Sequence, residues 1–457
     1  MVAFASSIFA LAITLAGEAA AATPAEKLAI APELYRPLPG EQAPPTPAGD
    51  AEIDRAIAAF QQRDYPDALK ALVSAKQRND EVPPGRLALA RLFIATKQSG
   101  PGRTMLEHAA ADAPDYPGVY VLLGSISLRE GRVTDAMLAL ERASALIESG
   151  QWGDRAERYF LMESHAGLAA VAEARQDWTS AEHHLSELLK YDPDNGTARQ
   201  RLARALFALE RHTAAYDELQ IADKDDPSVD PAAITMGWLY ERTGDLDKAN
   251  EWMEYAVRTN PDDARVHLGY ATWLLRRDRP EDAKSHAQAA KRLDAENREV
   301  KLLLGVIARY LKNYDEAEKI FQEVHQDEPG DFRVSNLLAL VLAEQDDPQK
   351  RNRALQLAEV NARQYPRSAE ALATLGWVHY RLNQAEQAEK YLQAAMTGRS
   401  VSSETAYYMA HLLADRGQLE DAKQLLDSAV ESSGVFIYRR DAKEWLDRIG
   451  ENPGSGN

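Results

Sequence analysis

Small residues recur at a nearly fixed interval along most of this chain of 457 residues. Eight of the ten steps between successive positions are 34 residues long, and the other two are 45 and 37. The positions are Ala68, Gly102, Ala136, Ala181, Ala215, Ala249, Ala283, Ala317, Ala354, Ala388 and Ala422. A repeat of this length is typical of stacked structural repeats that bury apolar surface only against their neighbours. The chain is therefore not expected to form one closed core.

A second series of small residues precedes the first, in most repeats by twelve residues. Its members are Ala56, Ala90, Gly124, Ala169, Ala203, Gly237, Ala271, Gly305, Ala339, Gly376 and Ala410. We interpret the two series as the crossing points of paired helices, because Gly or Ala lets two backbones approach closely. Larger side chains recur on the second helix to fill the adjacent space, at Leu72, Leu106, Leu140, Leu185, Leu219, Met253 and Phe321. Prolines at positions 114, 193, 227, 261, 329 and 366 separate the repeats.

The repeat over residues 232–263 shows the pattern most clearly. It carries Met236, Gly237, Tyr240, Gly244, Ala249, Ala256 and Pro261. The period and the pattern resemble the tetratricopeptide repeat (TPR), a helix-turn-helix repeat, over about residues 51–434 and eleven repeats. The resemblance implies an all-α fold, a right-handed superhelical solenoid of antiparallel helix pairs. An amphipathic helix within residues 435–450 is expected to cap the last repeat, followed by a flexible tail over 451–457.

Two repeats depart from the period. The fourth gains eleven residues, which we expect to extend its first helix over 154–174. This longer helix has two open interpretations, a purely structural one and a functional one in which it protrudes or bends the superhelix. The ninth repeat gains three residues within 346–351, which we interpret as a longer loop.

The N-terminal residues indicate export. An apolar run over residues 4–16 is followed by four alanines, which predicts a signal peptide over residues 1–22. Seven prolines within residues 23–50 then predict a semi-rigid linker. We expect a periplasmic or envelope-associated protein with no transmembrane anchor after cleavage. The absence of cysteine excludes a lipid-anchored N-terminal cysteine, so the protein is not expected to be a lipoprotein.

Composition and motifs argue against several classes of function. The formal net charge of −18 disfavours nucleic acid and anionic lipid surfaces as partners. With no cysteine, disulfides, thiolate metal sites and a cysteine nucleophile are excluded. The ten histidines lack zinc-protease spacing, and no phosphate-binding glycine loop or nucleophile elbow is present. We expect no catalytic residues, no metal, no cofactor and no enzymatic activity.

The resemblance implies that the first helices line a concave groove. Side chains flanking the small residues of these helices are then candidates for binding a partner. They are Trp238, Glu241, Arg242, Arg276, Arg309, Tyr310, Asn336, Trp377, Tyr380, Arg381, Tyr407, Tyr408 and His411. Trp, Tyr and Arg often anchor partners because they combine a large contact area with a polar end. The alternative is that these aromatic residues only pack between adjacent first helices.

Several functions fit this pattern. The first hypothesis is a non-enzymatic scaffold in the cell envelope, which binds an extended protein or peptide segment in the groove. The second is a glycan-binding module that assists polysaccharide export through the same aromatic residues. A third hypothesis is a hydrolase whose catalytic motif is not recognised. If the N-terminal segment is not a signal peptide, a cytoplasmic adaptor is a further alternative.

Overall fold

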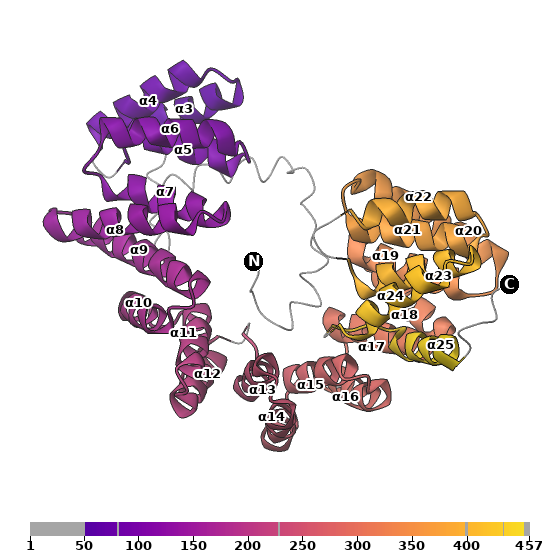
Figure 1. Ribbon diagram of the computed structural model, residues 1–457. Coiled ribbons are helices and arrows are strands. Elements are labelled where there is room, and N and C mark those ends of the chain that lie inside the picture. The colour runs from indigo at the N-terminus through magenta and orange to yellow at the C-terminus, as the bar shows by residue number, and fades with distance from the viewer. Residues whose placement is uncertain (1–50, 80–81, 227–228, 398–400, 433, 452–457) are drawn as a thin grey trace. The chain divides into compact units, whose positions relative to one another are not determined.

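The computed structural model describes residues 51–79, 82–226, 229–397, 401–432 and 434–451 (Figure 1). Within these ranges the chain forms 23 helices and no strand, which confirms the all-α prediction. The predicted signal peptide (1–22) and linker (23–50) lie outside the described residues, as does the predicted tail beyond residue 451. Among the described residues, no helix is both long enough and apolar enough to cross a bilayer.

The chain divides into two compact units, the first ending at Thr235 and the second beginning at Met236. The first unit contains α3 (Ala51–Gln61), α4 (Tyr65–Arg78), α5 (Gly85–Ala95), α6 (Ser99–Asp112), α7 (Pro117–Arg129), α8 (Val133–Ser149), α9 (Asp154–Ala174), α10 (Trp178–Tyr191), α11 (Gly196–Ala208) and α12 (His212–Asp225). The boundary falls within α13 (Ala232–Thr243).

The second unit continues with the remaining helices. They are α14 (Leu246–Thr259), α15 (Ala264–Arg276), α16 (Pro280–Leu293), α17 (Arg298–Tyr310), α18 (Tyr314–Asp327), α19 (Phe332–Glu344), α20 (Pro348–Gln364), α21 (Ala369–Arg381), α22 (Ala385–Ala395), α23 (Ser403–Asp415), α24 (Leu419–Val430) and α25 (Arg439–Glu451). Helices α3 to α24 form eleven consecutive pairs, one for each predicted repeat.

The small residues lie where the two helices of a repeat cross, as predicted. A Cβ added at Gly124 would come within 2.5 Å of Leu140, and one at Gly305 within 2.5 Å of the Phe321 ring. Leu140 and Phe321 are both fully buried. Protein interiors are close-packed, so these positions leave no room for a larger side chain.

A residue with left-handed backbone geometry turns the chain between the two helices of most repeats. Gly131, Gly244 and Gly417 hold this position with φ angles of 72°, 83° and 78°. Non-glycine residues hold it elsewhere with φ between 59° and 64°, namely Arg63, Lys97, Gln176, Glu210, Asp278, Lys312 and Asn383. The tight turn keeps the paired helices antiparallel. The left-handed backbone is strained at the non-glycine residues, because their Cβ comes close to the backbone.

The extra residues of the fourth and ninth repeats lie in helices. First helix α9 has the predicted bounds and 21 residues, eight more than the 13 of α11. Helix α8, the second helix of the third repeat, has 17 residues, three more than the 14 of α10. The prediction placed all eleven extra residues in the fourth repeat, whereas three of them lengthen α8 in the third. The loop predicted for the ninth repeat is wrong, because α20 also has 17 residues and begins at Pro348. The three extra residues therefore lengthen the second helix.

Helix α25 follows the last repeat and packs on α24. Its bounds, Arg439–Glu451, lie close to the helix predicted within residues 435–450. The segment that leads into this helix does more than cover the last repeat, because it also reaches the first helices of earlier repeats.

Candidate partner-binding face

The first helices of the second unit form one continuous surface. Helix α15 contacts α17, α17 contacts α19, α19 contacts α21, and α21 contacts α23. Helix α13 joins them through Arg276, whose guanidinium lies 5.2 Å over the Trp238 ring. We call the surface formed by α13, α15, α17, α19, α21 and α23 the first-helix face. Every residue predicted to line the groove lies on one of these helices.

Trp377 is the centre of an aromatic cluster on α21 and α23. Its ring stacks on Tyr380, with centroids 5.1 Å apart, and on Tyr408, with centroids 4.4 Å apart. Tyr407 and His411 lie 6.3 and 5.5 Å from it. Five predicted groove residues are thus brought together. Trp377 is 2% exposed and Tyr408 1%, so the centre of the cluster is closed to solvent, whereas Tyr380 and His411 are half-buried.

The chain's own C-terminal segment, residues 434–449, covers this cluster. Tyr438 stacks on Tyr407 with centroids 4.5 Å apart and rings nearly parallel at 9°. Trp445 lies against His411, with centroids 4.6 Å apart. Phe436 is 1% exposed and lies 5.9 Å from Tyr407. The aromatic residues predicted to hold a partner therefore hold a polypeptide segment of the same chain.

The phenol of Tyr438 lies between a buried cation and a buried carboxylate. Arg309 Nη2 donates to the Tyr438 hydroxyl oxygen at 2.8 Å and to that of Tyr408 at 3.2 Å. The Tyr438 hydroxyl donates to Glu344 Oε1, which also accepts from the Trp377 indole N–H at 2.8 Å. Arg309 is 5% exposed, and the Glu344 side chain 7%. Buried charges are costly without partners, so the phenol helps to satisfy both groups.

Arg440 extends the contact to the turn between α15 and α16. Its two terminal nitrogens donate to both carboxylate oxygens of Glu281 at 3.0 and 3.1 Å. The same side chain donates to the Asp278 carboxylate at 3.2 Å and to the Asp278 carbonyl at 3.1 Å. Its guanidinium also lies 5.9 Å from the centre of the Tyr310 ring. Paired donation of this kind requires the planar fork of an arginine.

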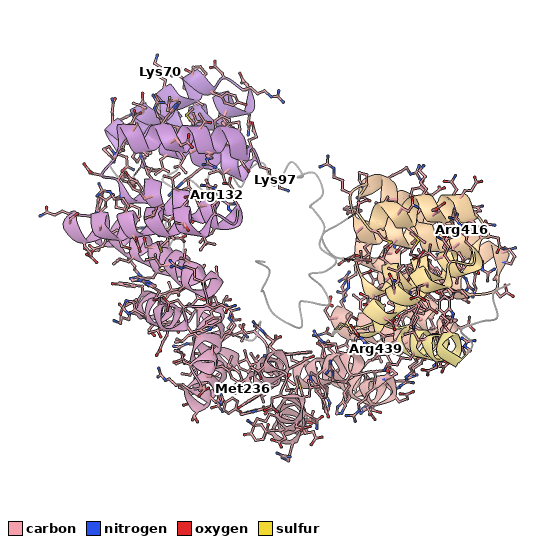
Figure 2. The ribbon with its side chains drawn as sticks, in the orientation of Figure 1. Lys70, Lys97, Arg132, Met236, Arg416 and Arg439 are labelled. Atoms are coloured by element: carbon pink, nitrogen blue, oxygen red, sulfur yellow. The ribbon has the colours of Figure 1, made fainter. Side chains whose placement is uncertain are left out.

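Arg439 shapes the turn from which the C-terminal segment starts, and Figure 2 labels it at the first position of α25. Its Nη2 donates to the carbonyl oxygens of Ser432 at 2.7 Å and Gly434 at 2.9 Å. An ion pair between Lys312 and Asp441, with Nζ and Oδ1 2.7 Å apart, adds a further link to the repeats.

Two predicted groove residues lie in apolar surroundings. Asn336 is fully buried and donates to Glu370 Oε1 at 2.8 Å, so its side chain offers no surface to a partner in this structure. Burial raises the pKa of Glu370 to about 8, against the hydrogen bond from Asn336, which lowers it. Burial lowers the pKa of His411 to about 4, so this ring is neutral at pH 7.

Helices α13 and α15 carry a separate charged cluster on the same face. Arg276 Nε and Arg277 Nη2 lie 3.4 and 3.6 Å from Glu241 Oε1. Burial raises the pKa of Glu241, while the two arginines lower it. Trp238, under Arg276, is 4% exposed, whereas Arg242 on the same helix is exposed. The C-terminal segment reaches the turn after α15 at Asp278, next to this cluster.

Glu344 is the central acceptor of the site, and the sequence prediction missed it. It lies five positions after the small residue of its first helix, as do Arg242, Arg276, Tyr310 and Arg381, which were all selected. Arg381 Nη1 lies 3.8 Å from Glu344 Oε2. The same spacing therefore contained the signal for Glu344.

Comparisons with known proteins agree with the repeat pattern. The family model of the cilia and flagella-associated protein 70 middle TPR-like domain matches residues 238–364. Tetratricopeptide repeat models match residues 172–236 and 369–397. TPR repeat-containing protein YpiA of Bacillus subtilis is 22% identical over 387 residues, which cover 84% of this chain and 88% of YpiA.

Two further proteins are similar to this chain. TPR repeat-containing protein PA4667 of Pseudomonas aeruginosa is 26% identical over 217 residues, covering 46% of this chain and 34% of PA4667. A solved structure of the yeast protein Tom70 is 16% identical and covers 88% of this chain and 96% of the Tom70 chain, with a TM-score of 0.35.

Paired helices with small residues at every crossing define a solenoid protein built from helix-turn-helix repeats. The repeat length of 34 residues and the matched family models specify the kind of repeat. The chain carries tetratricopeptide repeats and is similar to proteins of the tetratricopeptide repeat family. Proteins of this family are scaffolds for protein–protein interaction and are generally not catalytic.

Proposed function

We propose that this protein is a non-enzymatic scaffold that binds an extended segment of a protein partner on the first-helix face of its second unit. The observation that carries the proposal is the C-terminal segment, which lies on this face through ring stacking at Tyr407 and hydrogen bonds at Arg309 and Glu344. A surface that accommodates one polypeptide segment has the chemistry to accommodate another. We further propose that the protein acts in the cell envelope, on the basis of its N-terminal signal-like sequence.

The stacking geometry favours a peptide over a glycan. Sugar-binding aromatic residues present a ring face to the ligand, whereas Trp377 already stacks on Tyr380 and Tyr408. The polar groups of the site form charged pairs that suit arginine and phenol side chains. We therefore rank the glycan-binding hypothesis second.

Site-specific crosslinking in the source cells tests the scaffold proposal. A photoreactive residue replaces the exposed Arg242 on α13, and a control replaces Leu138 on α8, which is 59% exposed. The proposal expects one protein to be crosslinked at position 242 and not at position 138. Crosslinking to polysaccharide alone, or equal yields at both positions, would contradict it.

Cell fractionation tests the proposed location. The mature protein should appear in the envelope fraction with a new N-terminus close to Thr23, measured by mass spectrometry of the intact protein. A cytoplasmic protein that retains residues 1–22 would instead support the adaptor hypothesis.

A further inference from the structure

The C-terminal segment contacts the first-helix face at points far apart in the sequence. Arg440 binds Asp278 and Glu281, which precede it by 162 and 159 residues. Tyr438 contacts Arg309 and Glu344, 129 and 94 residues earlier. A helix that only covered the last repeat would need contacts with α23 and α24 alone. The segment is therefore placed along the face in the way that a bound peptide would be.

The site around Tyr438 binds its hydroxyl group as well as its aromatic ring. Its hydroxyl accepts from Arg309 and donates to Glu344 at the same time. Phenylalanine would keep the stacking on Tyr407 but would leave both buried charged groups without this partner. The face therefore distinguishes tyrosine from phenylalanine.

The hydrogen bonds of Arg440 require the several nitrogen donors of a guanidinium group. Glu281 receives two parallel hydrogen bonds, and Asp278 receives one at its carboxylate and one at its carbonyl. Lysine carries a single nitrogen and cannot form this set. Because the Arg440 side chain is 44% exposed, its ion pairs are screened by solvent and hold the segment weakly. A competing segment can therefore replace this contact.

We propose that the first-helix face recognises, in a partner protein, a segment that enters a helix with tyrosine followed two residues later by arginine. The chain's own residues 438–440 occupy this site as an internal ligand, which the partner must displace. This inference rests on the proposed scaffold function and adds the chemistry of the partner. Acidic groups at Asp278, Glu281 and Glu344 give the site the charge that suits such a basic segment.

Binding of the chain's own segment in trans tests the proposal. The probe is a fluorescent peptide of residues 434–449, and the receptors are the intact chain and a chain that ends at Ser432. Fluorescence anisotropy should show binding to the shortened chain and at least about tenfold weaker binding to the intact chain. The peptide with Tyr438→Phe should bind about tenfold more weakly, the one with Arg440→Lys about threefold more weakly, and one with Arg448→Lys should bind unchanged.

A second receptor, of full length, tests the proposal even if circular dichroism shows that the shortened chain does not fold. The intact chain with Arg440→Glu loses the contact to Glu281 and should bind the peptide more tightly than the unaltered chain. The matched control is Arg448→Glu, the same charge change on the same helix, where the Arg448 guanidinium donates only to the Glu444 carbonyl. This control should bind the peptide no better than the unaltered chain.

Three results would overturn the proposal. The first is no peptide binding by any folded receptor, and the second is that the Tyr438→Phe and Arg440→Lys peptides bind as tightly as the unaltered peptide. The third is a dimer of the intact chain in solution, which would assign the face to the C-terminal segment of a second copy. If a partner is crosslinked at position 242 while the peptide fails to bind, the scaffold function stands and only this inference fails.

Discussion

Single small residues set the distance between the two helices of each repeat. At Gly305 an added Cβ would lie 2.5 Å from Phe321 Cε1 and 2.7 Å from Cζ. Phe321 is fully buried. The sequence predicted these crossings well, because close packing allows only Gly or Ala there and the same constraint recurs in every repeat.

Replacing Gly305 by valine should therefore destabilise the second unit. We expect a loss of about 2–3 kcal/mol in the free energy of unfolding, since overpacking forces side chains and backbone apart. Urea denaturation followed by circular dichroism measures the change. The control is Gly330→Val, at a turn where an added Cβ meets no atom within 4 Å. Equal effects of the two substitutions would contradict the packing explanation.

A histidine pair makes stability depend on pH. His165 and His184 place their Nδ1 atoms 3.2 Å apart between α9 and α10. Burial is the main cause that lowers the pKa of His184 to about 4; His165 and His183 add to the lowering, and Asp177 and Glu187 oppose it. The unfolded ring titrates near its usual pKa of 6.5, so the unfolded state binds more protons between these values.

Stability should consequently fall as the pH drops from 7.5 to 5. The contribution of His184 is about 1 kcal/mol, after allowance for solvent screening of a half-buried ring. Urea denaturation at the two pH values measures the loss, and His184→Gln should reduce it. If the variant loses as much stability as the unaltered protein, the pair is not the cause.

At the scale of elements, the loop predicted within residues 346–351 is wrong, although the local sequence carries the signals of a helix start. Pro348 occupies the first turn of α20, and the Asp347 side chain accepts from the N–H groups of Gln349 and Lys350. Aspartate before proline is a typical helix start, so the sequence contained the signal for a longer helix. The loop was predicted because the three residues were treated as an insertion between helices.

The hydroxyl group of Tyr438 links the C-terminal segment to two buried charged groups. Tyr438→Phe should destabilise the second unit by about 1–3 kcal/mol, because Arg309 and Glu344 lose a shared partner in a buried place. Urea denaturation measures the loss. The matched control is Tyr365→Phe, where the ring packs on Phe332 with centroids 4.8 Å apart. A Tyr438→Phe protein as stable as the Tyr365→Phe protein would contradict this role.

At the scale of the whole molecule, the sequence predicted the candidate face but not its occupant. The resemblance to the tetratricopeptide repeat assigns the groove to the first helices, and the repeat spacing then gives the positions of Trp377, Tyr407 and His411 on them. The covering by Tyr438 and Arg440 could not be found in this way. It depends on contacts across 94 to 162 residues, which no local pattern encodes.

The central claim is that the first-helix face of the second unit binds polypeptide and is occupied by the chain's own C-terminal segment. Hydrogen–deuterium exchange of the intact chain and of the chain that ends at Ser432 tests it most directly. We predict faster exchange in α17, α19, α21 and α23 of the shortened chain, and unchanged exchange in α3 to α12. Equal exchange of the two chains across α17 to α23 would contradict the claim.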